Sequence, residues 1–261
     1  MTQRYVFGSQ HDLAREQVQI LSTLWDGYTE RAFDTVGVAP GARCLDLGAG
    51  AGTATRMLAE RAGPTGDVLA VDLDASHYAD SPHARLVVHD ITTGLPEAGP
   101  FDVIHARLLL MHLPDREEIL ARLAEALAPG GWLVIADNGA LPRLISAPTT
   151  QDAEMFERFQ SLALANATRL EVSFDWAERI GTCMEINGLG EIHGVHVTNS
   201  APGGSLEAML SHNYVRQMEE SLLQAGIDPD DVQRYREIWL EPSVRFWFYG
   251  FACWAGRRPV G

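Results

Sequence analysis

The chain has 261 residues, 46% of them hydrophobic, which suffices for one large domain or for a domain with a sizeable insertion. Its 35 acidic residues outnumber its 20 basic ones, and the formal charge of -15 disfavours nucleic acid and anionic lipid as partners. No apolar run approaches the ~20 residues of a membrane span, and the first residues lack a signal-peptide pattern. We therefore expect a cytoplasmic protein with neither a nucleic-acid nor a membrane partner.

The first half of the chain alternates short apolar runs with helical patterns. Residues 9–36 carry apolar side chains at helical spacing, which predicts two helices. After them, strands are predicted over residues 41–48, 66–74, 84–91, 101–109 and 129–138, with helices over 53–62 and 115–127. Continuous apolar strands that alternate with helices are typical of a parallel sheet covered on both faces. This pattern predicts a doubly wound, Rossmann-like α/β core.

The second half is richer in helical patterns. Helices are predicted over residues 151–169, 175–184, 205–226 and 228–240, and strands over 190–200 and 243–259. The two late strands would extend the same sheet. Three cysteines occur without the CxxC or Cys/His spacing of a metal site, so neither a disulfide framework nor zinc is indicated.

The glycine-rich stretch CLDLGAGAG lies between the first predicted strand and the next helix. A dinucleotide fold requires G-x-G-x-x-G/A at this place, but Thr53 or Thr55 occupies the last required position, depending on the register. Asp46 stands two residues before Gly48, where an acid suits a cation better than a pyrophosphate. This favours S-adenosylmethionine, whose sulfonium and ammonium groups are positive, over a nicotinamide dinucleotide.

Two later acids strengthen that interpretation. Asp72 ends the second strand of the sheet, from where a carboxylate can accept hydrogen bonds from ribose hydroxyls, and Leu73 would lie against the adenine. Asp90 ends the third strand, where it could receive the adenine amine, with Ile91 packed alongside. An Asp after a strand is also common as a turn or cap residue. Acids at successive strand ends nevertheless meet at one edge of a parallel sheet.

In order, spacing and residue type, the chain resembles the class I S-adenosylmethionine-dependent methyltransferases. More narrowly, it is similar to bacterial small-molecule enzymes of the ubiquinone-biosynthesis and natural-product type. The resemblance rests on the runs CLDLGAGAG, VLAVDLD, VVHDI, FDVIHARLLLMHL and LAPGGWLVIAD, and it covers roughly residues 1–140. It implies a seven-stranded, mostly parallel sheet with an antiparallel C-terminal strand. It also implies methyl transfer from S-adenosylmethionine to a small, partly apolar metabolite.

The resemblance assigns roles to particular residues. The backbone of Gly48, Ala49 and Gly50 would approach the methionine part of the cofactor, with Asp72 at the ribose and Asp90 at the adenine. The residues expected near its reactive end are Ala106 and Arg107.

The N-terminal segment resembles a subset of these enzymes. Arg15 and Gln19 lie four apart, hence on one helical face, where an arginine fork could bind the cofactor carboxylate; a solvated face is the alternative. Tyr5 and Phe7 are candidates for a lid, or else ordinary packing residues.

We expect four segments. Residues 1–36 would form an N-terminal helical cap and residues 37–142 the cofactor-binding core. Residues 143–242 would supply helical insertions and the sixth strand on the acceptor side, and residues 243–261 the last strand of the core sheet. The N-terminal helices are candidates for packing across a homodimer.

His105, at the end of the fourth strand, is our candidate for a catalytic base, and a histidine facing away is the alternative. Asp137 and Asn138 resemble two metal ligands of the catechol-type enzymes, but Arg107 would stand where those enzymes have another acid, so no metal is predicted. Both remain candidate acceptor contacts. Two other functions stay open: S-adenosylmethionine chemistry without methylation (cyclisation, decarboxylation or hydroxylation), and a nicotinamide oxidoreductase.

Overall fold

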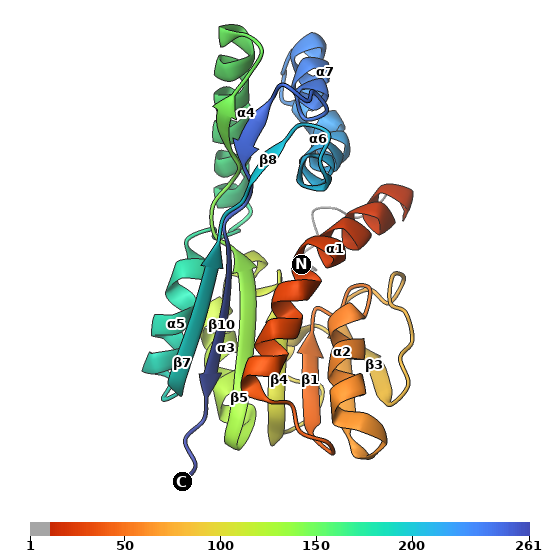
Figure 1. Ribbon diagram of the computed structural model, residues 1–261, viewed down its shortest axis with the longest axis vertical. Helices are drawn as coiled ribbons and strands as arrows, with labels where there is room; N and C mark the ends of the chain where they lie inside the picture. The colour runs from red at the N-terminus through yellow and green to blue at the C-terminus, as the bar shows by residue number, and fades with distance from the viewer. Residues whose placement is uncertain (1–10) are drawn as a thin grey trace. The chain divides into compact units, whose positions relative to one another are not determined.

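A computed structural model of the chain describes residues 11–261, so Tyr5 and Phe7 lie outside the described residues (Figure 1). The chain forms two compact units. The core unit comprises Trp25–Ala140, Ala167–Val197 and Gly250–Gly261, and the second unit comprises the residues up to Leu24, Leu141–Asn166 and Thr198–Tyr249. The chain thus leaves the core unit twice and returns to it twice. The sequence predicts helical insertions and the sixth strand of the sheet over residues 143–242.

A seven-stranded sheet lies at the centre of the core unit. Its strands, in spatial order, are β3 (Ala84–Val88), β2 (Asp67–Asp72), β1 (Arg43–Leu47), β4 (Phe101–Arg107), β5 (Leu127–Asn138), β10 (Phe251–Arg257) and β7 (Gly190–Val197). Only β10 runs antiparallel to its neighbours, β5 and β7. The predicted fold class, a mostly parallel Rossmann-like sheet with an antiparallel C-terminal strand, is therefore confirmed.

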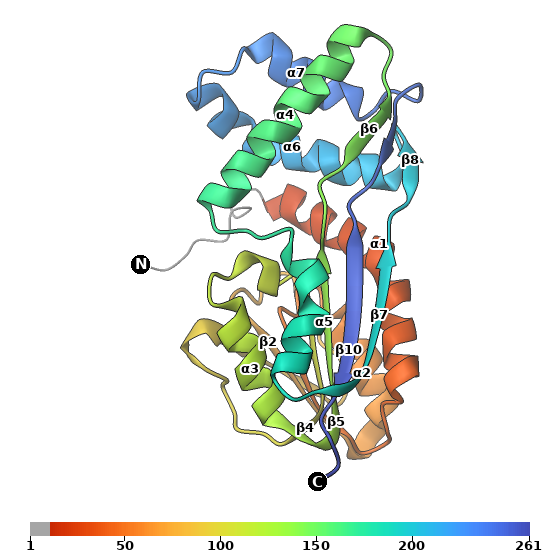
Figure 2. The same ribbon diagram turned by 90° about the vertical axis from the view of Figure 1, so that its left-hand side faces the viewer.

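Helices cover both faces of this sheet. The C-terminal part of α1 (His11–Val36) and α2 (Thr53–Ala62) lie on one face, and α3 (Arg116–Ala126) and α5 (Trp176–Ile186) lie on the other (Figures 1 and 2). The apolar positions that predict these helices are the ones that are buried, as with Leu58 on α2 and Leu123 on α3. One continuous helix, α1, replaces the two helices predicted over residues 9–36.

The second unit has its own small antiparallel sheet, which the sequence does not predict. Its strands are β6 (Arg143–Ser146), β9 (Arg245–Trp247) and β8 (Ser200–Pro202), and its helices are α4 (Thr150–Arg169), α6 (Leu206–Gln224) and α7 (Pro229–Ile238). Aromatic rings from α4, α7 and β9 form its core, where Trp239 contacts Phe156 and Phe246 at centroid distances of 5.0 and 4.9 Å. The segment 243–259, predicted as one strand, is divided between the two sheets as β9 and β10.

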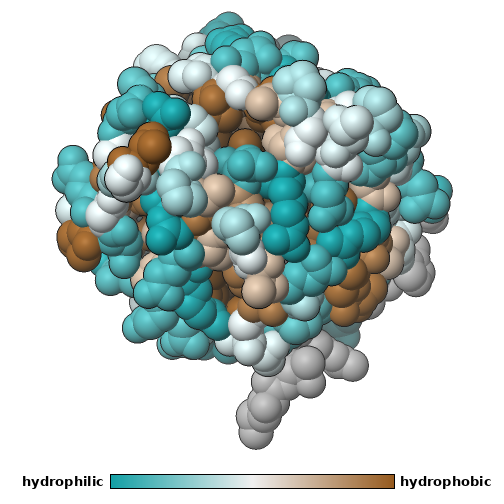
Figure 3. Space-filling model, turned by 90° about the horizontal axis from the view of Figure 1, so that it is seen from below, coloured by the Kyte–Doolittle hydropathy of each residue, from teal (hydrophilic) through white to brown (hydrophobic). Residues whose placement is uncertain are grey.

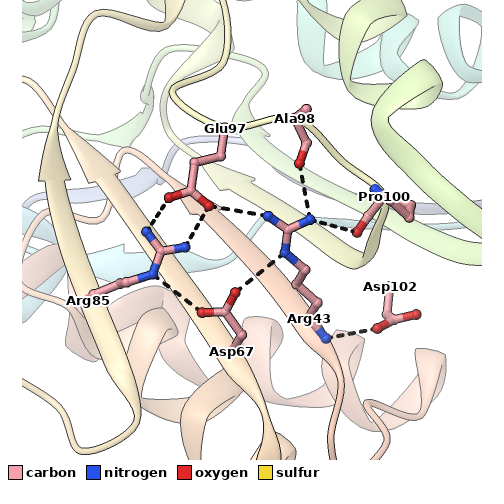
Figure 4. Close-up of polar contacts among 7 residues, drawn as sticks. All are labelled: Arg43, Asp67, Arg85, Glu97, Ala98, Pro100 and Asp102. Atoms are coloured by element: carbon pink, nitrogen blue, oxygen red, sulfur yellow. Dashed lines mark hydrogen bonds and ion pairs between the residues drawn. The ribbon is translucent and has the colours of Figure 1, made fainter.

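An ion-pair network joins the amino ends of β1, β2 and β3, opposite to the strand ends that carry the predicted site (Figure 4). Arg85 donates to both oxygens of Glu97 at 2.5 and 2.7 Å, and Arg43 bridges Glu97 and Asp67. Hydrogen bonds from Arg85 lower the pKa of Glu97. The surface seen from below mixes hydrophilic and hydrophobic patches, as expected for a solvated end of the sheet (Figure 3). No helix within residues 11–261 is long and apolar enough to cross a membrane.

Candidate functional site

The glycine loop connects the carboxyl end of β1 to the start of α2. Gly48, Gly50 and Gly52 have φ angles of 67°, 53° and 78°, which residues with a side chain rarely adopt. A Cβ atom on Gly48 would also lie 3.3 Å from the side chain of Leu109. The Gly48 amide donates to the Val71 carbonyl oxygen at 2.8 Å, which fixes the loop against β2. The loop backbone can therefore approach a ligand closely.

Asp72 connects this loop to the end of β2. Its Oδ2 accepts the amide hydrogen of Gly50 at 2.8 Å, and its Oδ1 accepts that of Asp74 at 3.0 Å. A carboxylate oxygen can accept two hydrogen bonds, so each oxygen retains capacity for another donor. Leu73, next to it, is 54% exposed, so its apolar side chain is accessible beside the carboxylate.

Asp90 lies just beyond the end of β3, the neighbouring strand. It caps a short 3-10 turn, η2 (Ile91–Thr93), and its Oδ1 accepts both the amide and the hydroxyl of Thr92, at 3.0 and 2.7 Å. These hydrogen bonds lower the pKa of Asp90, so the group is ionised near neutral pH. Ile91 is buried beneath the turn. Asp72 and Asp90 thus both stand at the carboxyl edge of the core sheet.

Asp46 and His105 form a buried pair on neighbouring strands β1 and β4. The ring Nδ1 of His105 donates to Asp46 Oδ1 at 2.7 Å, and the hydroxyl of Thr55 donates to Oδ2 at 2.5 Å. Both side chains are about 1% exposed, and the His105 ring meets the edge of Phe33 on α1. This places His105 in the packing between sheet and helix, where the alternative interpretation of the sequence puts it. The hydrogen bonds from His105 and Thr55 together occupy both carboxylate oxygens of Asp46.

Arg107, at the end of β4, connects the glycine loop to α1. Its guanidinium donates to Asp26 Oδ1 at 3.0 Å, to Thr29 at 2.8 Å and to Thr53 at 3.4 Å. Thr53, the first residue of α2, donates in turn to Asp26 at 2.9 Å. The resemblance predicts Arg107 at the reactive end of a cofactor; in the structure its charge is balanced by Asp26. Ala106, the preceding residue, is 1% exposed.

Asp137 and Asn138 end β5, next to β4. Asp137 is fully buried and accepts the amide of Met111 at 3.3 Å, and burial raises its pKa to about 8. The Oδ1 atoms of both residues are buried without a hydrogen-bond partner. Among residues 11–261, no three His, Cys, Asp or Glu side chains come together as metal ligands would.

Arg15 and Gln19 belong to the second unit. Both are exposed on α1, on the same helical face, as their spacing predicts. Unlike these two residues, Gln17 is buried, and it accepts a hydrogen bond from Gln217 of α6. The sequence analysis misses Gln17, Asp26 and Thr53. Asp26 and Thr53 become neighbours of Arg107 only through folding, and a polar residue within a helix gives no sign of burial by itself.

The strand order, the glycine loop and the acids at successive strand ends together define a Rossmann-like protein of the class I methyltransferase type. The chain belongs to the methyltransferase domain family, whose model matches residues 2–190. This confirms the resemblance inferred from the sequence.

Individual relatives match over shorter stretches. The chain is 41% identical over 97 residues to methyltransferase str2 of Strobilurus tenacellus, a match that spans 36% of this chain and 35% of that protein. It is also 41% identical over 98 residues to the trans-aconitate 2-methyltransferase of Variovorax paradoxus, spanning 36% of this chain and 38% of that one. The matches thus span little more than a third of the length of these curated relatives.

Solved structures share the fold over most of the chain. The YcgJ protein of Bacillus subtilis has a TM-score of 0.54 at 14% identity, with 90% of this chain and 100% of that one covered. Phosphoethanolamine N-methyltransferase 2 of Haemonchus contortus, in complex with S-adenosyl-L-methionine, has a TM-score of 0.50 at 16% identity, with 85% and 49% covered. At these identities the likeness concerns the fold.

Proposed function

We propose that the protein transfers the methyl group of S-adenosylmethionine to a small, partly apolar metabolite, in natural-product biosynthesis. Membership of the methyltransferase domain family supports the reaction class. The name of one relative, a trans-aconitate 2-methyltransferase, is consistent with a small-molecule acceptor. The observation that carries the proposal is the link from Asp72 to Gly50, which joins the expected ribose ligand to the glycine loop.

The residues at the carboxyl edge of the core sheet fit this cofactor. Asp72 has one lone pair free on each oxygen for the two ribose hydroxyls, and the exposed Leu73 side chain offers apolar contact to the adenine. Asp90 is ionised and uses only Oδ1 in its own turn, so Oδ2 can accept the adenine amine. Gly48 and Gly50 allow the backbone to lie along the methionine part.

When bound, S-adenosylmethionine supplies an electrophilic methyl group on a positively charged sulfur. The chain's contribution is then to hold and align the reactants and to exclude water. Arg107, Asp26 and Thr53 keep the start of α2 fixed, and with it the end of the glycine loop. We assign no proton transfer to His105, because its ring is buried and its Nδ1 is bonded to Asp46. This pair instead holds β1, β4 and α2 together.

The variant Asp72→Ala tests the cofactor site. Losing the charged hydrogen bonds to ribose should weaken S-adenosylhomocysteine binding by about 1–3 kcal/mol, measured by titration calorimetry. Glu60→Ala is the matched control: it removes one exposed acid from α2 of the same unit and should leave affinity unchanged. Equal affinity of Asp72→Ala and the unaltered protein would remove Asp72 from the ribose role.

A further inference from the structure

The loop between β4 and α3, residues 108–113, has two of its backbone amides bound by a buried acid. Asp137, at the end of β5, is 0% exposed and accepts the amide hydrogen of Met111 at 3.3 Å. The Leu109 amide also bonds to this carboxyl, and both bonds oppose the effect of burial on its pKa. Burying an acid is costly unless it is hydrogen-bonded, and two of the partners here belong to one loop. We call residues 108–113 the β4–α3 loop.

The conformation of the β4–α3 loop depends on its hydrogen bonds. Leu108 has a φ angle of 52°, which a residue with a side chain rarely adopts. Its amide donates to the Ala136 carbonyl of β5 at 2.8 Å, and Arg116 of α3 donates to the Leu110 carbonyl at 3.2 Å. Such a backbone conformation persists only where its surroundings hold it. Asp137 is the buried side chain that holds the amides of this loop.

One side chain of the β4–α3 loop packs against the glycine loop. A Cβ atom on Gly48 would lie 3.3 Å from the Cβ of Leu109, so the Leu109 side chain lies directly against the glycine. The Gly48 amide is bonded to the Val71 carbonyl of β2 at 2.8 Å. Gly48 is therefore fixed by a hydrogen bond to β2 and by contact with Leu109. Two contacts thus connect Asp137 to the glycine loop, and both lie within the core unit.

We propose that Asp137 is a positioning residue for the cofactor: through the β4–α3 loop it places Leu109 against Gly48 and so fixes the path of the glycine loop. The inference rests on the proposed function, because it concerns the loop that would lie along the methionine part of S-adenosylmethionine. Asp137 touches no reacting atom in this role. Without it, the glycine loop would have more conformations open to it, and cofactor binding would have to order them at a cost in affinity.

This role requires a hydrogen-bond acceptor rather than a charge. Burial raises the pKa of Asp137 to about 8, against the electrostatic effect of Arg116 on α3, so the carboxyl is mostly protonated at pH 7. A protonated carboxyl still accepts an amide hydrogen. Asparagine has the same shape and also offers a carbonyl oxygen as acceptor, whereas leucine has a similar size and no acceptor. Asparagine should therefore keep the β4–α3 loop in place, and leucine should not.

Titration calorimetry of the full chain with S-adenosylhomocysteine at pH 7 tests the role, at a temperature where circular dichroism shows each variant folded. Asp137→Asn should bind within about twofold of the unaltered protein, and Asp137→Leu about tenfold more weakly, because its loop amides lose their acceptor. Leu109→Ala removes the side chain that contacts Gly48 and should weaken binding to a similar extent. Asp102→Leu is the matched control: Asp102 accepts the Arg43 amide at 2.8 Å at the amino end of the same sheet, and its loss should leave affinity unchanged.

A merely structural Asp137 would give a different result. Asp137→Leu would then have a lower Tm but the affinity of the unaltered protein once folded, and this outcome would overturn the proposal. Equal weakening by Asp137→Asn and Asp137→Leu, or an unchanged affinity of Leu109→Ala, would also overturn it. If Asp137→Leu does not fold, Leu109→Ala decides.

The double variant Asp137→Leu with Leu109→Ala adds a test of coupling. Because both residues act through one contact, the double variant should bind about as weakly as the weaker single variant, and fully additive losses would contradict the proposal. Absence of S-adenosylhomocysteine binding by the unaltered protein would contradict the proposed function as well. Every other contradicting outcome leaves the proposed function intact, since the unaltered protein then binds the ligand.

Discussion

Asp137 ends β5 with its carboxyl group fully buried, and its titration should affect stability. Burial raises its pKa to about 8, against the opposing effect of the Met111 and Leu109 amides, while in the unfolded chain the pKa is near the ordinary value of about 4. Between these values the unfolded chain binds fewer protons than the folded one. The free energy of unfolding should therefore fall as pH rises through this window.

The titration of His112 changes the free energy of unfolding in the opposite direction, and it does so at lower pH. Burial lowers its pKa to about 4, so the folded state binds fewer protons than the unfolded state up to about pH 6.5, and stability rises with pH over that range. Because His112 still titrates in the unfolded chain near pH 6.5, the effect of Asp137 is isolated by comparing the unaltered protein with an Asp137 variant over the same pH range.

Asp137→Asn should remove the pH dependence that this carboxyl causes. Urea unfolding at pH 6.5 and 8 should show a smaller loss of free energy with rising pH in the variant, by up to about 1.4 kcal/mol per pH unit. Parallel curves for the variant and the unaltered protein would mean that Asp137 ionises in the folded state at its ordinary pKa.

At the scale of helices and strands, two glycines allow α5 and β7 to pack closely against strand β10. A Cβ atom on Gly181 of α5 would lie 2.6 Å from the indole ring of Trp254, and one on Gly194 of β7 would lie 2.5 Å from it. The indole nitrogen donates to the Ala177 carbonyl at 2.8 Å, so the ring cannot move without losing this bond. The close approach of three elements thus depends on the missing side chains.

Gly181→Ala should destabilise the protein by about 1–3 kcal/mol through overpacking, measured by chemical unfolding. Gly27→Ala is the matched control, because Gly27 lies within helix α1 with no atom within 4 Å of its would-be Cβ. There alanine's higher helix propensity should stabilise the protein by about 0.5–1 kcal/mol. Destabilisation of both variants by the same amount would mean that the contact with Trp254 does not limit this packing.

At the scale of helices and strands, the sequence predicts the elements that have a regular apolar pattern of their own. The alternation of apolar runs and helices predicts β1 to β5 and α2 to α6 closely, because each is bounded by turn residues and carries a regular apolar period. It does not predict the small sheet of the second unit, since β8 and β9 are three residues long. Strands so short are defined by their partners from distant segments rather than by their own pattern.

The candidate site also contains residues that the sequence predicts and contacts that it does not predict. Gly48, Asp72 and Asp90 can be found because strand ends and glycine spacing are local features. The partners of Arg107 and of His105 cannot, because Asp26 and Asp46 become their neighbours only when the sheet and helices assemble. The sequence therefore predicts where the site lies better than it predicts which charges remain available within it.

At the scale of the whole molecule, the core unit holds the glycine loop and the acids proposed to bind the cofactor. The chain crosses between the units at residues 24–25, 140–141, 166–167, 197–198 and 249–250, so neither unit is one continuous segment. Each therefore depends on the other for chain connectivity, and tests of function should use the full chain.

The central claim is that the core unit binds S-adenosylmethionine at the carboxyl edge of its sheet. Titration calorimetry of the full chain with S-adenosylhomocysteine tests it most directly, with NAD as the comparison ligand. We predict saturable binding of one S-adenosylhomocysteine per chain and no heat with NAD. Saturable binding of NAD without any binding of S-adenosylhomocysteine would contradict the account.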